Sequence, residues 1–278
     1  MSSTPRVRGA RPIFLAGCVT MALLAQPAHA QRPTAPKLLP KNTLAYLRVA
    51  DSRELSEDFM ATAFGRLTQD DQIRPLLSQL YGFGAKAFGQ VQEQIGVSLD
   101  QILAIPQGEI CLAVVGTEVG PPAFVGLLEV GDQMPTVEKL LKVAKGAAAG
   151  DGASIRTEKV DDTTLTIIDD KLAFGIRDDV VLIGSSVDAL KDLLAKWTAG
   201  DGAEGVTNFG DNRMFTAIMR QSLGTKEERP QVTWFVDPIE LFKNRAREDV
   251  GASMAIAMLP SLGLDGVKAA GGSFIINT

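Results

Sequence analysis

The pattern of apolar and polar positions divides the chain into strand-like and helix-like segments. Residues 43–49 alternate with an apolar majority, which predicts a β-strand, and Asp51 then begins a helical pattern. Further strands are predicted at 108–115, 122–130, 163–168, 171–176, 180–184, 231–236 and 272–277. Further helices are predicted at 71–95 with an interruption near Gly82 and Gly84, and at 99–105, 137–144, 186–197, 214–223 and 238–244. This order predicts an α+β fold with antiparallel sheets and packed helices.

The predicted turns and loops carry their own signals. Acidic pairs flank the three compact strands between residues 163 and 184, at 161–162, 169–170 and 178–179. Aspartate tolerates positive φ and bonds local amides, so these pairs indicate tight hairpin turns. The segments Gly146–Gly152 and Gly200–Gly210 are predicted to be loops of small residues.

The first thirty residues have the pattern of a secretion signal. A basic head without acidic residues contains Arg6, Arg8 and Arg11. An apolar run from Ile13 to Ala25 follows it. The run has about 13 residues, whereas a bilayer span needs roughly 20, so we expect a cleaved leader and not an anchor.

Small residues at Ala28 and Ala30 suit the signal peptidase, which predicts cleavage between Ala30 and Gln31 and a periplasmic or secreted protein. Residues 1–30 are then the signal peptide and residues 31–40 an extended, proline-rich lead-in. An alternative is lipidation at Cys18, which ends a Leu-Ala-Gly-Cys box. The apolar stretch comes mostly after Cys18, which favours cleavage after Ala30.

Removing the leader narrows the possible chemistry. It takes three basic residues and leaves 25 basic against 33 acidic ones, a formal net charge of −8. A chain this acidic without a cationic cluster is a poor candidate for binding nucleic acid. The only histidine, His29, lies in the leader, so the expected mature chain has no histidine triad and no histidine-ligated metal. Cys111 lies in an apolar strand pattern and is interpreted as a core residue.

We predict no transmembrane segment in the mature chain. The longest late uncharged stretch, 250–264, contains Pro260 and is interpreted as a buried helix. No dedicated cofactor or metal motif is present, so no cofactor and no metal ligand are predicted.

Two positions in the chain look duplicated. Asp51-x-x-Glu54-Leu55 follows one predicted strand, and Asp237-x-x-Glu240-Leu241 follows another. Residues 41–200 are therefore interpreted as a full α+β unit and residues 201–278 as a partial second copy. The last strand could instead close the sheet of the first unit. Tyr46 and Trp234 lie on the two corresponding strands and are expected to pack in the core.

The chain resembles a family of uncharacterised exported proteins common in planctomycete-type bacteria. The resemblance is carried by Leu39-Pro40-x-x-Thr43-Leu44-Ala45-Tyr46-Leu47, Asp51, residues 96–100 and the meander 163–186. The family is a domain of unknown function, so the resemblance implies export and no active-site residues. Its members typically run longer, which agrees with an incomplete second copy.

Three functional hypotheses remain open at this point. The first is a non-enzymatic protein of the cell envelope that binds or scaffolds an unknown envelope protein or polymer. The second is a carboxylate-dependent hydrolase of an extracytoplasmic polymer, whose catalytic residues are unknown because too many acids qualify. The third is a calcium-dependent adhesion module that uses the acidic pairs.

Overall fold

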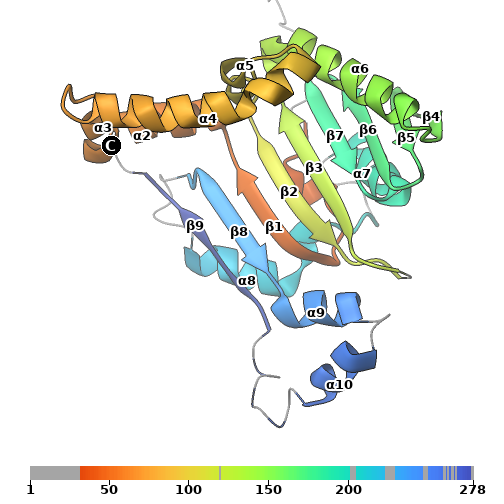
Figure 1. Ribbon diagram of the computed structural model, residues 1–278. Helices are drawn as coiled ribbons and strands as arrows, with labels where there is room; N and C mark the ends of the chain where they lie inside the picture. The colour runs from red at the N-terminus through yellow and green to blue at the C-terminus, as the bar shows by residue number, and fades with distance from the viewer. Residues whose placement is uncertain are drawn as a thin grey trace, which may run out of the picture. The chain divides into compact units, whose positions relative to one another are not determined.

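The computed structural model describes residues 32–118, 120–200, 205–222, 229–246 and 250–258, together with 261, 263, 266 and 268–276. Its strands are β1 (Thr43–Val49), β2 (Ile110–Val115), β3 (Ala123–Glu129), β4 (Ile155–Val160), β5 (Thr163–Ile168), β6 (Leu172–Arg177), β7 (Val180–Gly184), β8 (Val232–Val236) and β9 (Ala270–Phe274). They form one sheet in the order β4-β5-β6-β7-β3-β2-β1-β8-β9, and every neighbouring pair is antiparallel (Figure 1).

Helices connect the strands and pack on the sheet, which confirms the α+β class. The helices are α1 (Ala35–Leu38), α2 (Ser52–Ala61), α3 (Ala63–Thr68), α4 (Arg74–Ile95), α5 (Leu99–Leu103), α6 (Met134–Gly150), α7 (Val187–Ala199), α8 (Arg213–Ser222), α9 (Pro238–Ala246) and α10 (Val250–Met258), with short 3-10 turns η1 (Gly131–Gln133) and η2 (Phe209–Asp211). Among the described residues, no helix is long and apolar enough to cross a membrane.

The two faces of the sheet are covered differently. One face carries the main core, where side chains of α1, α7, η2 and α8 pack on Tyr46, Cys111, Leu127 and Phe235. A smaller cluster on the opposite face joins α5 and α6 to β3, β6 and β7 around Val137. Burying one apolar face under helices is the main stabilising contribution, at about 25 cal/mol per Å² of apolar surface. The part of the second face over β1, β2 and β8 lies beyond this smaller cluster.

The turn predictions are confirmed, and the helices predicted to begin at Asp51 and Ser186 are capped by these side chains. The hairpin aspartates adopt left-handed backbone conformations, with φ near +50° at Asp161, Asp169, Asp170 and Asp178. These acids therefore serve as turn residues of the meander. The side chain of Asp51 accepts hydrogen bonds from the first amides of α2, as an N-cap should. The Ser186 hydroxyl caps α7 in the same way.

Two local predictions in helical regions are wrong, and one strand at the edge of the sheet was missed. Helix α4 runs without interruption through Gly82 and Gly84, where a side chain would meet open space. Helix α6 continues to Gly150 and absorbs most of the predicted loop at 146–152. Its alanines are strong helix formers and offset the cost of the glycines. Strand β4 was not predicted, because its charged sequence hides the usual apolar alternation.

Burial also departs from the prediction at several places. Tyr46 is buried as expected, but the side chain of Trp234 is 42% exposed and lies on the opposite face of the sheet. Helix α10 replaces the predicted buried helix at 250–264, and its Met254 is 69% exposed. The lead-in forms the short helix α1 and buries Leu38 and Leu39 instead of staying extended.

The two predicted units do not have separate sheets. Strand β8 pairs directly with β1, and β9 pairs with β8, so both continue the first sheet. The chain from Arg32 onward falls in one compact unit. The two Asp-x-x-Glu-Leu motifs make the same local hydrogen bond, because Asp51 and Asp237 each accept from the amide of the glutamate three residues later.

The burial of Cys111 predicts an unreactive thiol. Its side chain is fully buried, and burial raises the pKa of the thiol far above its usual value. The thiolate is the reactive species, so residues 31–278 should resist a disulfide-exchange reagent at pH 8 and react once unfolded in guanidinium. Comparing reagent consumption before and after unfolding checks this, and rapid labelling of the native protein would contradict it.

Candidate functional site

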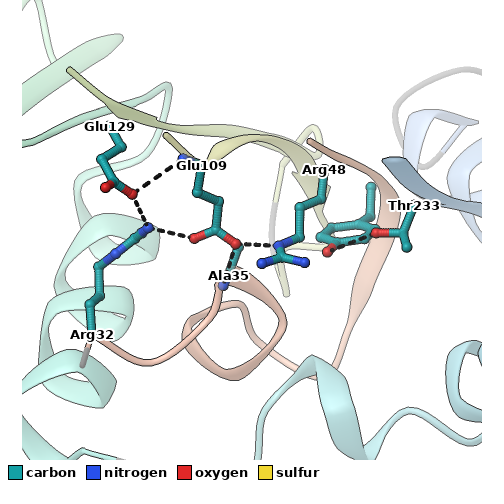
Figure 2. A network of polar contacts seen from close by, with 7 residues as sticks. Arg32, Ala35, Arg48, Glu109, Glu129 and Thr233 are labelled. Atoms are coloured by element: carbon teal, nitrogen blue, oxygen red, sulfur yellow. Dashed lines mark hydrogen bonds and ion pairs between the residues drawn. The ribbon is translucent and has the colours of Figure 1, made fainter. Parts of the chain in front are cut away.

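A buried ionic network ties the lead-in to the centre of the sheet. Figure 2 shows Glu109, which directly precedes β2, between the side chains of Arg32 and Arg48. Arg32 Nη2 lies 2.6 Å from one Glu109 oxygen and 3.0 Å from Glu129 Oε2, while Arg48 Nε contacts the other Glu109 oxygen. One arginine from the lead-in therefore bridges β2 and β3, and a second from β1 completes the pairing.

Backbone groups add to this network. The amide of Ala35 donates to Glu109 Oε1 at 3.2 Å, and the amide of Glu109 donates to Glu129 Oε2 at 3.2 Å. Gly108 leaves the space that the Glu129 carboxylate needs, because a Cβ at Gly108 would lie 2.5 Å from its Cδ. The carboxylates are thus bonded by both side chains and backbone, as buried charges must be.

Aromatic residues surround the network on two sides. The Arg32 guanidinium lies 5.4 Å from the ring centre of Trp197 on α7, and that of Arg177 lies 5.2 Å from it. On the other side, the Thr233 hydroxyl donates to the hydroxyl of Tyr46 at 3.4 Å. The network is therefore continuous with the main core.

Burial changes the acid–base behaviour of these groups. It raises the pKa of Tyr46 well above the usual value of a phenol, so this hydroxyl stays neutral. For Arg48, burial opposes the positive charge, but the adjacent Glu109 carboxylate leaves its pKa above the ordinary value. Arg48 consequently remains charged.

Glu109 and Glu129 contact the same arginine nitrogen, so they form the kind of close carboxylate pair that the hydrolase hypothesis needs. Only 4% of the Glu109 side chain is exposed, and its oxygens already accept from two arginines and one amide. A general acid must carry a proton to a substrate in a cleft. An arginine-paired carboxylate inside the core is poorly placed for this, and the arrangement fits a structural anchor.

Two cavities lie elsewhere, around the start of β1 and the helix α7. The larger has a volume of about 830 Å³ and the smaller about 550 Å³, and both are lined by Pro40, Asn42 and Asp192. Neither glutamate of the network lines them. Lys196, the most buried charged residue in the larger cavity, is already paired with Asp192 on the same helix. Among the described residues that line the larger cavity, the one buried charge is therefore already neutralised.

An open apolar row crosses the second face of the sheet. Leu112, Leu47 and Trp234 lie directly opposite one another on β2, β1 and β8, and each side chain is more than 40% exposed. We call these three residues the apolar row. Large exposed apolar residues that adjoin one another are typical of interaction surfaces. The sequence prediction missed this row because it assigned Trp234 to the core.

The residues predicted for leader processing, Ala28, Ala30 and Gln31, lie outside the described residues, as does Cys18. The acidic pairs of the meander are described, and they occupy hairpin turns. Within the described part of the chain, no three histidine, cysteine, aspartate or glutamate side chains gather as a metal site would require. The calcium hypothesis therefore gains no support from these turns.

Removing the central carboxylate should destabilise the protein strongly. Glu109→Gln leaves Arg48 largely buried without a countercharge and leaves Arg32 with Glu129 alone, and breaking such a buried pair costs about 3 kcal/mol or more. Chemical denaturation of residues 31–278 measures this loss. The control is Glu158→Gln, whose ion pairs with Arg156 and Lys191 are solvent-exposed and should contribute little. Equal stability of the two variants would contradict the anchoring role.

Comparison of the chain with protein-family models, with curated proteins and with solved structures finds no match.

Proposed function

We propose that this chain is an exported, non-enzymatic protein of the cell envelope that binds or scaffolds an envelope protein or polymer. The observation that carries this proposal is the apolar row of Leu112, Leu47 and Trp234. Full burial of such a side chain is worth roughly 1.5–3 kcal/mol relative to full exposure, and these three residues are 42–44% exposed, so a partner that covers them gains a part of that energy.

The state of the charged groups supports binding over catalysis. The most buried acid, Glu109, is held by two arginines, and the aspartates of the meander form its turns. A mature chain starting at Gln31 also has no histidine, because His29 would leave with the leader. Export itself is supported by the basic head, the apolar run and the small residues of the leader.

The proposal extends to the origin of the fold. The two Asp-x-x-Glu-Leu motifs follow the adjacent antiparallel strands β1 and β8 and cap the helices α2 and α9. A duplicated unit would have this arrangement, and the resemblance to exported planctomycete proteins favours the same class. In this view the sheet is a shared platform assembled from both copies.

Trp234→Glu should abolish partner capture. A carboxylate at the β8 end of the apolar row would be desolvated by any partner that covers the row, which we expect to reduce binding at least about tenfold. Immobilised residues 31–278 are incubated with envelope extract, and the bound material is quantified. Phe83→Glu is the matched control, because Phe83 is a 72% exposed apolar residue on α4. Equal capture by both variants would count against the apolar row as the binding surface.

Export predicts a defined new N-terminus. The chain expressed with its leader in a bacterial host should be recovered outside the cytoplasm, and N-terminal sequencing should begin at Gln31 or within a residue or two of it. Ala30→Arg should block processing, because the peptidase needs a small side chain there. A lipid-modified N-terminus at Cys18, or an intact leader on the recovered protein, would overturn this part of the proposal.

A further inference from the structure

Strand β9 ends the sheet and leaves one edge of its backbone unpaired. The amide of Asp237 donates to the carbonyl of Leu44, and that of Ala50 donates to the carbonyl of Gln231, which places odd-numbered residues of β8 toward β1. Even-numbered residues of β8 then bond to β9, and the register leaves the backbone groups of Gly271 and Ser273 facing outward. In the part of the chain that the structure describes, no strand pairs with this outer edge.

The two edges of the sheet are built differently. The opposite edge strand, β4, carries Arg156, Glu158 and Lys159, and its charges form ion pairs with Asp170 and Lys191. Charged side chains on an edge strand are a common protection against pairing with another chain. Strand β9, with the sequence Ala-Gly-Gly-Ser-Phe, contains neither charge nor proline. Its edge therefore lacks the protection that the other edge has.

Helix α8 packs against β9 and fixes its position. Gly271 lies so close to its neighbours that a Cβ there would be 2.7 Å from the Trp234 carbonyl oxygen and 3.0 Å from Ile218 Cγ2. The hydroxyl of Ser273 donates to the carbonyl of Ser222 at the end of α8. The edge is thus already extended and positioned, so an incoming strand does not have to order it.

On the face that carries the apolar row, Gly272 of β9 lies under the side chain of Trp234. Gly272 has no side chain, and the indole of Trp234 lies against it, since a Cβ there would be 3.3 Å from Trp234 Nε1. Phe274, two residues further and on the same face, is 58% exposed. A side chain placed opposite Gly272 by a neighbouring strand could pack on the indole, as aromatic residues do when they shield strand glycines.

We infer that the partner of this protein binds by adding an extended segment to the outer edge of β9, with an apolar side chain opposite Gly272 against Trp234. This rests on the proposed function and specifies how the partner is recognised. Backbone hydrogen bonds from Gly271 and Ser273 supply affinity, and packing of the apolar side chain on the Trp234 indole supplies selectivity. A flexible apolar segment fits better than a second copy of the chain. Pairing of two five-residue edges alone buries far less than the roughly 1,200 Å² of a stable dimer.

The test uses residues 31–278 and a peptide that copies residues 122–130, flanked by lysines for solubility. These residues include β3, an alternating segment that the same sheet already pairs beside β2. Two further peptides carry N-methyl groups, one at the positions of Phe124, Gly126 and Leu128, and the other at the positions of Val125 and Leu127. Only alternate amides of an added strand face the sheet, so one methylated peptide should lose about tenfold or more in affinity and the other should retain it.

Protein variants locate the site of binding. Phe274→Lys adds a charge two residues from Gly272 on the same face and should weaken binding of the unmethylated peptide about tenfold. Ile155→Lys makes the same change at a 36% exposed residue of β4 and should leave binding unchanged. Both variants replace exposed side chains, and circular dichroism checks that each is folded. Equal effects of the two variants would overturn the inference.

Other outcomes separate this inference from the proposed function. Absence of saturable peptide binding, or equal loss with both methylated peptides, overturns strand addition. If Trp234→Glu still abolishes partner capture in that case, the binding function stands without this mode of recognition. A concentration-dependent dimer that Phe274→Lys dissociates would show that a second copy takes the edge, which also overturns the inference.

Discussion

The fold depends on neutralising one buried carboxylate. Glu109 lies at the entrance to β2, in the middle of the sheet, where an unpaired charge would be prohibitively costly. Its two arginines come from β1 and from the lead-in, and the lead-in amide of Ala35 joins them. The same contacts that satisfy the charge therefore hold α1 on the sheet and close the main core. Three segments of the chain, the lead-in, β1 and the start of β2, therefore meet at this carboxylate.

The proposed binding surface and the main core lie on different faces of the sheet. One face is covered by α1, α7, η2 and α8, and the charged side chains of the buried network on this face are paired with one another. The other face is covered only in part, by α5 and α6, and presents the apolar row beyond them. The two edges of the sheet also differ, because ion pairs protect β4 against pairing with another strand and β9 has no such protection. A surface that is open on one face and along one edge suits an extended ligand better than a small substrate.

The sequence predicted well those elements that short-range interactions determine. The turn aspartates, the Asp51 and Ser186 caps and the apolar strands follow from short-range rules and are present. The glycines of α4 misled the prediction, because in water-facing positions they cost too little to break a long helix. The charged β4 was missed because an edge strand does not need apolar alternation.

The candidate site could not be predicted from the sequence, for a different reason. Glu109 and its arginines are separated by 61 and 77 residues, and no short-range pattern joins them. Opposite charges inside two apolar strand segments, Arg48 in one and Glu109 at the start of the other, were the available clue. Trp234 was assigned to the core because the duplicated strands suggested equivalence, but strand register places it on the other face. Only the paired sheet decides which alternate residue faces which side.

The position of Arg32 links protein maturation to the integrity of the core. Processing after Ala30 would make Arg32 the second residue of the finished chain, so a residue that bridges two strands would lie almost at a free end. The contacts of Arg32 with Glu109, Glu129 and Trp197 would then fasten the new end of the chain to the folded core. An exopeptidase that then removed two residues would take Arg32 away and leave the buried Glu109 carboxylate with Arg48 alone.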